Sequence, residues 1–194
     1  MSLFKPVVTS AGVLLALSDI AEEIAPGSKF SDHVVTPAFR AGAFIGLIGV
    51  FVLALALIQL HNRQAERMGR GALVAALFAG FGTMLLACVT WSTAFLDPAA
   101  AKVAPALIDN TPPAILVVGF FMALAWFGLS WVAYAIVMLR SGMLAIAPVV
   151  VVLLGALACT LPMVPFAVAI FGLGLAWLGL APARVPARQL LPAT

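Results

Sequence analysis

Charged residues are scarce in this chain. Asp, Glu, Lys and Arg make up only 9% of its 194 residues, whereas 64% of the residues are apolar. Typical soluble domains have about 25% charged and about 45–50% apolar residues. A soluble fold of this length cannot cover so much apolar surface with so few charges. We therefore expect the lipid bilayer to be the solvent for most of the chain.

Histidine and cysteine are also rare, with two of each and no C-x-x-C or Cys/His ligand spacing. Zinc sites and redox dithiols need such spacing, so we predict no metal centre. His33 and His61 are expected on opposite sides of the membrane, which argues against bis-histidine haem, and we predict no cofactor. The net charge of +3 comes from scattered residues, so nucleic-acid binding is not expected. Without a nucleophile motif, a phosphate loop or a dinucleotide fingerprint, no catalytic residue is assigned.

Long apolar segments dominate what the sequence does contain. A transmembrane helix needs about 20 mostly apolar residues to cross about 30 Å of hydrocarbon. Turn and charge signals separate six such segments, which predicts an all-α polytopic membrane helix bundle. It forms one domain, 1–182, followed by a flexible tail, 183–194. The predicted spans are 7–24, 41–60, 71–95, 114–139, 143–160 (interrupted by Pro148) and 166–180, with loops at 25–40, 61–70 and 98–113.

The first span has two alternatives. In a five-span version, segment 7–24 lies flat on the outer face of the membrane. In another, it is a signal peptide that is cut after Ser18. We expect it to be retained as a span.

The distribution of charge predicts the orientation of the bundle. With six spans, seven basic residues fall on the side of the termini, and three fall on the other side. The positive-inside rule then places both termini in the cytoplasm of a bacterial-type plasma (inner) membrane. Six of the seven acidic residues fall on the outer side, so we expect a locally acidic outer face. The seven basic residues are Lys5, Arg63, Arg67, Arg70, Arg140, Arg184 and Arg188, and the other three are Lys29, Arg40 and Lys102.

An acidic patch interrupts the first span. At helical spacing its three carboxylates share one face, opposite a stripe of Val13, Leu17, Ile20 and Ile24. Ionisable residues inside a span are costly and suggest function, so the patch could bind a cation or perform acid–base chemistry in an outward-facing pocket. The alternative is a solvated helix end before the turn at Pro26. The candidate pocket residues are Asp19, Glu22, Glu23, His33, Arg40, Trp91, Asp97, Asp109 and Trp126.

Two further surfaces predict contacts with lipid or protein. Gly42, Gly46 and Gly49 place small residues on one helix face, where a partner protein or a second copy could approach closely. Arg63, Arg67 and Arg70 recur at i, i+4 and i+7, and this basic face can meet anionic lipid headgroups.

These features lead to two functional hypotheses. The first is a non-catalytic subunit or binding partner in a membrane assembly, because little mass lies outside the membrane and no catalytic set is present. The second is a membrane-embedded enzyme or carrier for a lipid-like or neutral small molecule, with an outward-facing acidic pocket. The last five spans carry no central charge, which argues against a proton-coupled pump or an ion channel.

Overall fold

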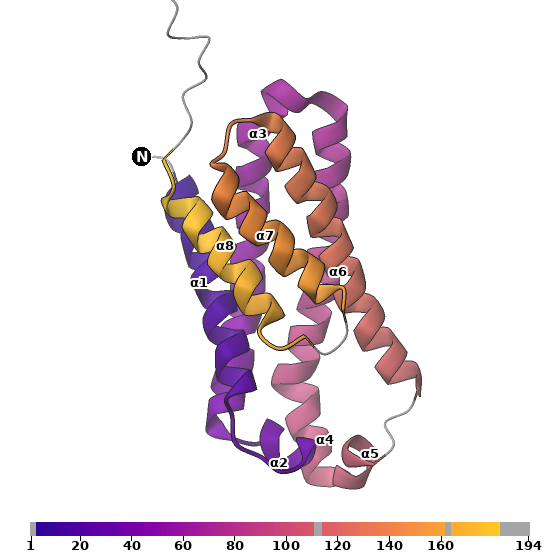
Figure 1. The fold of residues 1–194 in the computed structure, drawn as a ribbon. Coiled ribbons are helices and arrows are strands. Elements are labelled where there is room, and N and C mark those ends of the chain that lie inside the picture. The colour runs from indigo at the N-terminus through magenta and orange to yellow at the C-terminus, as the bar shows by residue number, and fades with distance from the viewer. Residues whose placement is uncertain (1–2, 111–113, 162–163, 183–194) are drawn as a thin grey trace, which may run out of the picture.

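The computed structural model describes residues 3–110, 114–161 and 164–182, with the backbone alone at 65–68. All regular elements in these ranges are helices, so the all-α prediction is confirmed (Figure 1). Four helical segments, Phe4–Glu23, Pro37–Gln64, Gly69–Val103 and Ala114–Ser141, are long and apolar enough to cross a membrane. The elements are α1 (Phe4–Glu23), α2 (Phe30–Val34), α3 (Pro37–Trp91), the π-helix η1 (Ser92–Leu96), α4 (Asp97–Val103), α5 (Pro105–Asp109), α6 (Ala114–Ser141), α7 (Ile146–Cys159) and α8 (Ala167–Leu180).

The helix α3 consists of two antiparallel arms joined at Gly69 (Figure 1). The predicted loop 61–70 is therefore wrong, because helix runs up to and away from this one residue. Gly69 has a φ of 57°, a left-handed conformation that glycine adopts without steric cost. The residues beside it are good helix formers such as Gln, Glu, Arg and Met, so helix continues close to the turn on both sides. The reversal itself is therefore confined to a single glycine.

Both arms of α3 extend past the predicted span ends. The first arm begins at Pro37, because the Thr36 hydroxyl accepts a hydrogen bond from the Phe39 N–H (3.3 Å) and Pro37 takes the first helical position. The second arm continues through η1 into α4. The predicted loop 98–113 therefore contains α5 and all of α4 except Asp97, while its residues 111–113 lie outside the described ranges.

Close packing of α1 against the first arm of α3 and against α8 forms one side of the bundle. Gly42, Gly46 and Gly49 lie at the α1–α3 contact, where an added Cβ would meet Ser18 or Leu14. The small-residue face is thus occupied within the chain. This corrects the expectation that these glycines face a partner or a second copy.

The helices α7 and α8, which form a hairpin, are shorter than the four candidate spans. Each has 14 residues, which corresponds to about 21 Å of helix. In Figure 1 the hairpin turns back before it reaches the end of the bundle formed by α2, α4 and α5. Pro148 lies in the first turn of α7, where its missing N–H is not needed, so the predicted interruption of this helix is wrong.

The centre of the bundle is aromatic, and three of its buried polar side chains form hydrogen bonds. The Trp131 indole N–H donates to the Thr83 hydroxyl (3.0 Å), and that hydroxyl donates to the Ala79 carbonyl (2.8 Å). Ser130 donates to the Phe127 carbonyl (2.8 Å). These three side chains are satisfied inside the protein, whereas the buried Tyr134 hydroxyl beside Trp131 has no hydrogen-bond partner among the described residues.

Candidate functional site

A cavity of about 620 Å³ lies just beyond the tip of the α7–α8 hairpin. Its volume is in the range typical of small-molecule sites. Cys159, Val164 and Ala167 at the hairpin tip form one wall, and α1, the two arms of α3 and α6 supply the others. The cavity exists because the hairpin ends short of its neighbours. Both cysteines of the chain are free thiols.

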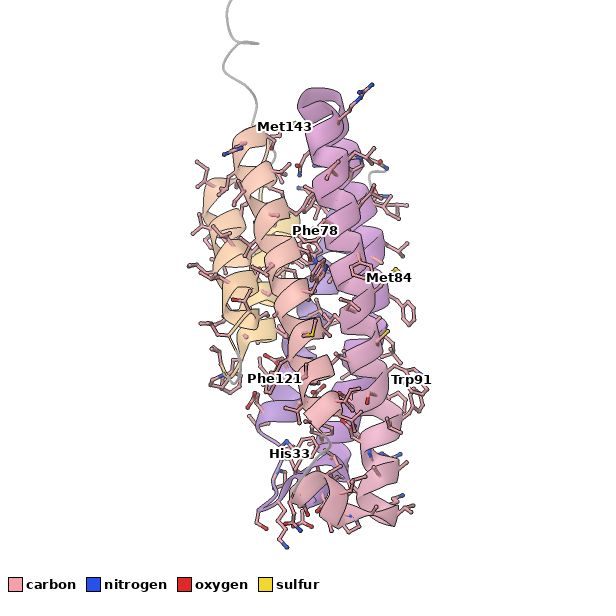
Figure 2. The ribbon with its side chains drawn as sticks, turned by 90° about the vertical axis from the view of Figure 1, so that its right-hand side faces the viewer. His33, Phe78, Met84, Trp91, Phe121 and Met143 are labelled. Carbon is pink, nitrogen blue, oxygen red and sulfur yellow. The ribbon has the colours of Figure 1, made fainter. Side chains whose placement is uncertain are left out.

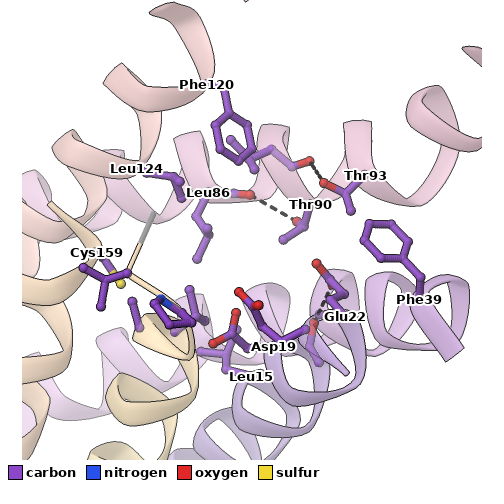
Figure 3. A pocket seen from close by; sticks show the side chains of 18 of the residues that line it. Leu15, Asp19, Glu22, Phe39, Leu86, Thr90, Thr93, Phe120, Leu124 and Cys159 are labelled. Atoms are coloured by element: carbon purple, nitrogen blue, oxygen red, sulfur yellow. Dashed lines mark hydrogen bonds between the residues drawn. The ribbon is translucent and has the colours of Figure 1, made fainter. Parts of the chain in front are cut away.

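The helix α1 turns its acidic face toward this cavity. Asp19 and Glu22 are half-buried, and in Figure 3 both carboxylates point into the space opposite Thr90. The opposite stripe is exposed on the outside of the bundle, with Leu17 at 51% and Ile24 at 67%. This orientation favours the pocket interpretation of Asp19 and Glu22 over that of a solvated helix end. Glu23 also lines the cavity but is exposed.

Asp19 is held by the first turn of α8. Its Oδ2 accepts a hydrogen bond from the Ala169 N–H at 2.8 Å. The first N–H groups of a helix lack intrahelical partners, and Phe166, at the start of α8, supplies no side-chain cap. A carboxylate at this position satisfies one of those groups and complements the positive end of the helix dipole. Asp19 therefore joins α1 to α8 at the edge of the cavity.

Glu22 has a free carboxylate oxygen. Its Oε1 accepts a hydrogen bond from the Ser18 hydroxyl, one helical turn earlier, at 3.0 Å. Its Oε2 has no hydrogen-bond partner among the described residues. Glu22 also lies near enough to Asp19, Glu23 and Asp97 for their charges to interact. Among the described residues that line the cavity, none is Lys or Arg, and His33 is the only one with a basic side chain.

The facing wall comes from the second arm of α3 and from η1. Asp97 lines the cavity directly after η1, and its Oδ1 accepts a hydrogen bond from the Ser92 hydroxyl at 3.3 Å. Thr90 and Thr93 line it too, and their hydroxyls donate to carbonyls of their own helix. A π-helical turn inside a long helix is rare and frequently occurs at functional sites. Here it contains Thr93 and lies between Thr90 and Asp97.

Short helices cover the far end of the cavity. The N–H and the hydroxyl of Ser31 in α2 donate to the two oxygens of Asp109 in α5, at 2.8 and 2.6 Å. These bonds favour the charged carboxylate and lower the pKa of Asp109 below its usual value. His33 lines the cavity from α2, with its ring stacked on Phe30 and edge-on to Phe39.

The structure brings five of the nine predicted site residues to the cavity: Asp19, Glu22, Glu23, His33 and Asp97.

The other four lie elsewhere, which corrects their grouping with the pocket. Arg40 is exposed in a separate groove, and Asp109 is bonded to Ser31 in the covering helices. Trp91 is 54% exposed on the outer surface of α3 (Figure 2). Trp126 packs edge-on against Phe78, also outside the cavity.

Several lining residues were not predicted. The position of Ser18 could have been predicted, because it precedes Glu22 by one helical turn and therefore lies on the same helix face. Phe120, Phe121 and Leu124 form the apolar wall from α6, but nothing distinguishes them from the other apolar residues of that span. Cys159 is likewise one small apolar residue among many.

The predicted lipid-facing arginines are only partly described. The Arg63 guanidinium lies 3.6 Å from the centre of the Phe4 ring, so it contacts α1 within the chain. Arg70 is exposed beside the Gly69 turn. The side chain of Arg67 lies outside the described residues.

The carboxylates spread around the cavity wall and do not converge. Among the described residues, no group of three or more His, Cys, Asp or Glu side chains is placed to hold a metal ion. No family model matches the chain, and comparison with curated proteins and with solved structures finds no significant match.

Proposed function

We propose that this chain is a membrane-embedded carrier or enzyme for a lipid-like small molecule that bears a hydrogen-bond donor or a positive charge. The observation behind the proposal is the Glu22 carboxylate, which faces a cavity of about 620 Å³ with one oxygen unpartnered. Across the cavity lie Phe120, Phe121 and Leu124. Such a space suits a molecule with a hydrocarbon portion and one polar head.

Charge selects the kind of head group. In the described part of the chain, four carboxyl groups line the cavity and no Lys or Arg does, so an anionic ligand would meet repulsion. An ionised carboxylate in a low-dielectric site is costly unless a donor or a cation pairs with it. A primary amine supplies both. We therefore expect amines to bind better than alcohols, and alcohols better than carboxylates.

We propose further that the four long helices cross the membrane and that α7 and α8 enter it as a hairpin from the side of the termini. Under this proposal all six predicted segments are embedded in the membrane, but only four of them cross it. Both arrangements leave the two termini on the same side, and the excess of basic residues there supports a cytoplasmic location. Irregular backbone at membrane depth is tolerated where it lines a cavity, which suits the hairpin tip.

The expected role as a non-catalytic subunit of a membrane assembly is the alternative proposal. It loses the support of Gly42, Gly46 and Gly49, because α1 occupies that face. No other described surface specifically favours it.

The test uses dodecylamine, dodecanol and dodecanoate, which share a chain length and differ in head group. Their binding to the protein in lipid nanodiscs is measured by calorimetry. Dodecylamine should bind most tightly, and Glu22→Gln should weaken its binding about 10- to 100-fold, because a hydrogen bond to a charged group contributes about 1.5–3 kcal/mol.

The matched control is Asp32→Asn. Asp32 is an exposed carboxylate near the same end of the bundle, bonded to Ser28 and absent from the cavity wall. Equal dodecylamine affinity in wild type and Glu22→Gln would refute the proposal, as would an equal loss in Asp32→Asn.

A further inference from the structure

A second hollow lies between the two arms of the α3 hairpin. It is a groove of about 320 Å³. Arg40 and Phe44 from the first arm form one edge, and Phe95 and Lys102 lie on η1 and α4 opposite. Arg40 follows Phe39, which lines the large cavity, so the groove and the cavity lie on different faces of the first arm. The groove is a separate site from the acidic cavity.

The charge of the groove is opposite to that of the cavity. Arg40 and Lys102 are both exposed, and none of the described residues that line the groove carries a carboxyl group. Neither cation has an ion-pair partner among the described residues. Arg40 also sits in the first turns of α3, where the helix dipole disfavours a cation. The helix itself gains nothing from this arginine, whereas a bound anion would meet both cations and the positive helix end.

The floor of the groove is aromatic and leads toward the membrane interior. Phe44 and Phe95 meet edge-on with ring centres 5.3 Å apart. Ile48 and Phe51 continue the exposed apolar surface along the first arm, one and two turns further into the span. Positive charge at the end of the span and apolar surface further along the helix match a molecule with an anionic head and a hydrocarbon tail.

We propose that this groove binds one anionic phospholipid, with its phosphate between Arg40 and Lys102 and an acyl chain across Phe44 and Phe95. The occupant is a membrane lipid because the groove continues into exposed apolar surface on two candidate spans, which under the proposed arrangement faces lipid. A soluble phosphate would leave the aromatic floor unfilled.

The test counts tightly bound phosphatidylglycerol by native mass spectrometry and compares phosphatidylcholine with the same chains. The double variant Arg40→Gln/Lys102→Gln should retain one phosphatidylglycerol fewer than wild type. Each lost cation contributes about 1 kcal/mol near a membrane surface, so affinity should fall about fivefold per substitution. Arg40→Lys keeps the charge and should retain the lipid.

Lys29→Gln is the matched control, since it removes an exposed cation near the same end of the bundle and outside the groove. An unchanged count in the double variant would overturn the proposal, as would an equal loss in Lys29→Gln. Inorganic phosphate is tested alone in the same titration. If it displaces the lipid at equal concentration, the groove is an anion site and the lipid assignment is wrong.

Discussion

The hydrogen bond between the Ala169 N–H and Asp19 can be removed by one substitution, Asp19→Ala. This change leaves the first turn of α8 without a cap, and it removes a negative charge from the positive end of that helix. Asp19→Asn is the informative companion, because its amide oxygen can accept the same bond without the charge. The pair separates the hydrogen bond from the charge.

The magnitudes follow from the geometry. Loss of a capping side chain costs about 0.5–2 kcal/mol, and the charge at a helix terminus contributes about 0.3–1 kcal/mol. The bond is short and part-buried, so solvent replaces it poorly and the upper half of the first range applies. We expect Asp19→Ala to lower the free energy of unfolding by about 2–3 kcal/mol, and Asp19→Asn by about 0.5–1 kcal/mol.

The assay is reversible unfolding in mixed micelles, followed by circular dichroism. Glu23→Ala is the control, because Glu23 is an exposed carboxylate of the same helix without a hydrogen-bond partner among the described residues. If Asp19→Ala and Glu23→Ala fall within about 0.5 kcal/mol of each other, the capping argument is wrong. A stabilised Asp19→Asn would also refute it, since the cost of burying the charge would then exceed its interaction with α8.

Two more predictions concern the covering helices and the orientation of the chain. The folded protein lowers the pKa of Asp109, so its bond to Ser31 contributes stability above the ordinary carboxyl pKa and loses it as the pH falls through the lowered value. Carbon NMR should show that the low pKa of Asp109 rises toward the ordinary carboxyl value in Ser31→Ala but does not reach it, because the backbone N–H of residue 31 still donates to the carboxylate. An unchanged pKa would contradict the assignment. In a cysteine-free background, a membrane-impermeant maleimide added to intact cells should label Ser28→Cys and leave Arg70→Cys unlabelled, and the reverse pattern would invert the proposed orientation.

Local sequence rules predicted the features that depend on one helix. The shared face of Asp19, Glu22 and Glu23 follows from helical spacing, and so does the opposing stripe. Which helices that face would meet was not predictable, because this depends on the packing partners of α1. In a bilayer the outside of the bundle is apolar, so an acidic face turns inward, contrary to the habit of soluble proteins.

Features that involve distant segments were beyond sequence reasoning. The cap on α8 joins residues 150 positions apart. The glycines of the first α3 arm carry a signal for close packing but no information on its partner. The turn at Gly69 looked like a loop, because seven of the ten residues at 61–70 are polar or charged, as in many loops. The conformation of one glycine, and not the length of the polar stretch, determines how the chain reverses.

The contact between α1 and α8 has a consequence for synthesis of the protein. Ala169 leaves the ribosome 150 residues after Asp19, which takes roughly 8–30 s at about 5–20 residues per second. During that interval the carboxylate lacks its partner, and α1 is the least apolar of the four candidate spans. The helix α1 is thus synthesised long before α8, yet it reaches its final environment only when α8 arrives. Chaperones or the insertion machinery must tolerate an unfinished N-terminal helix until the C-terminal hairpin arrives.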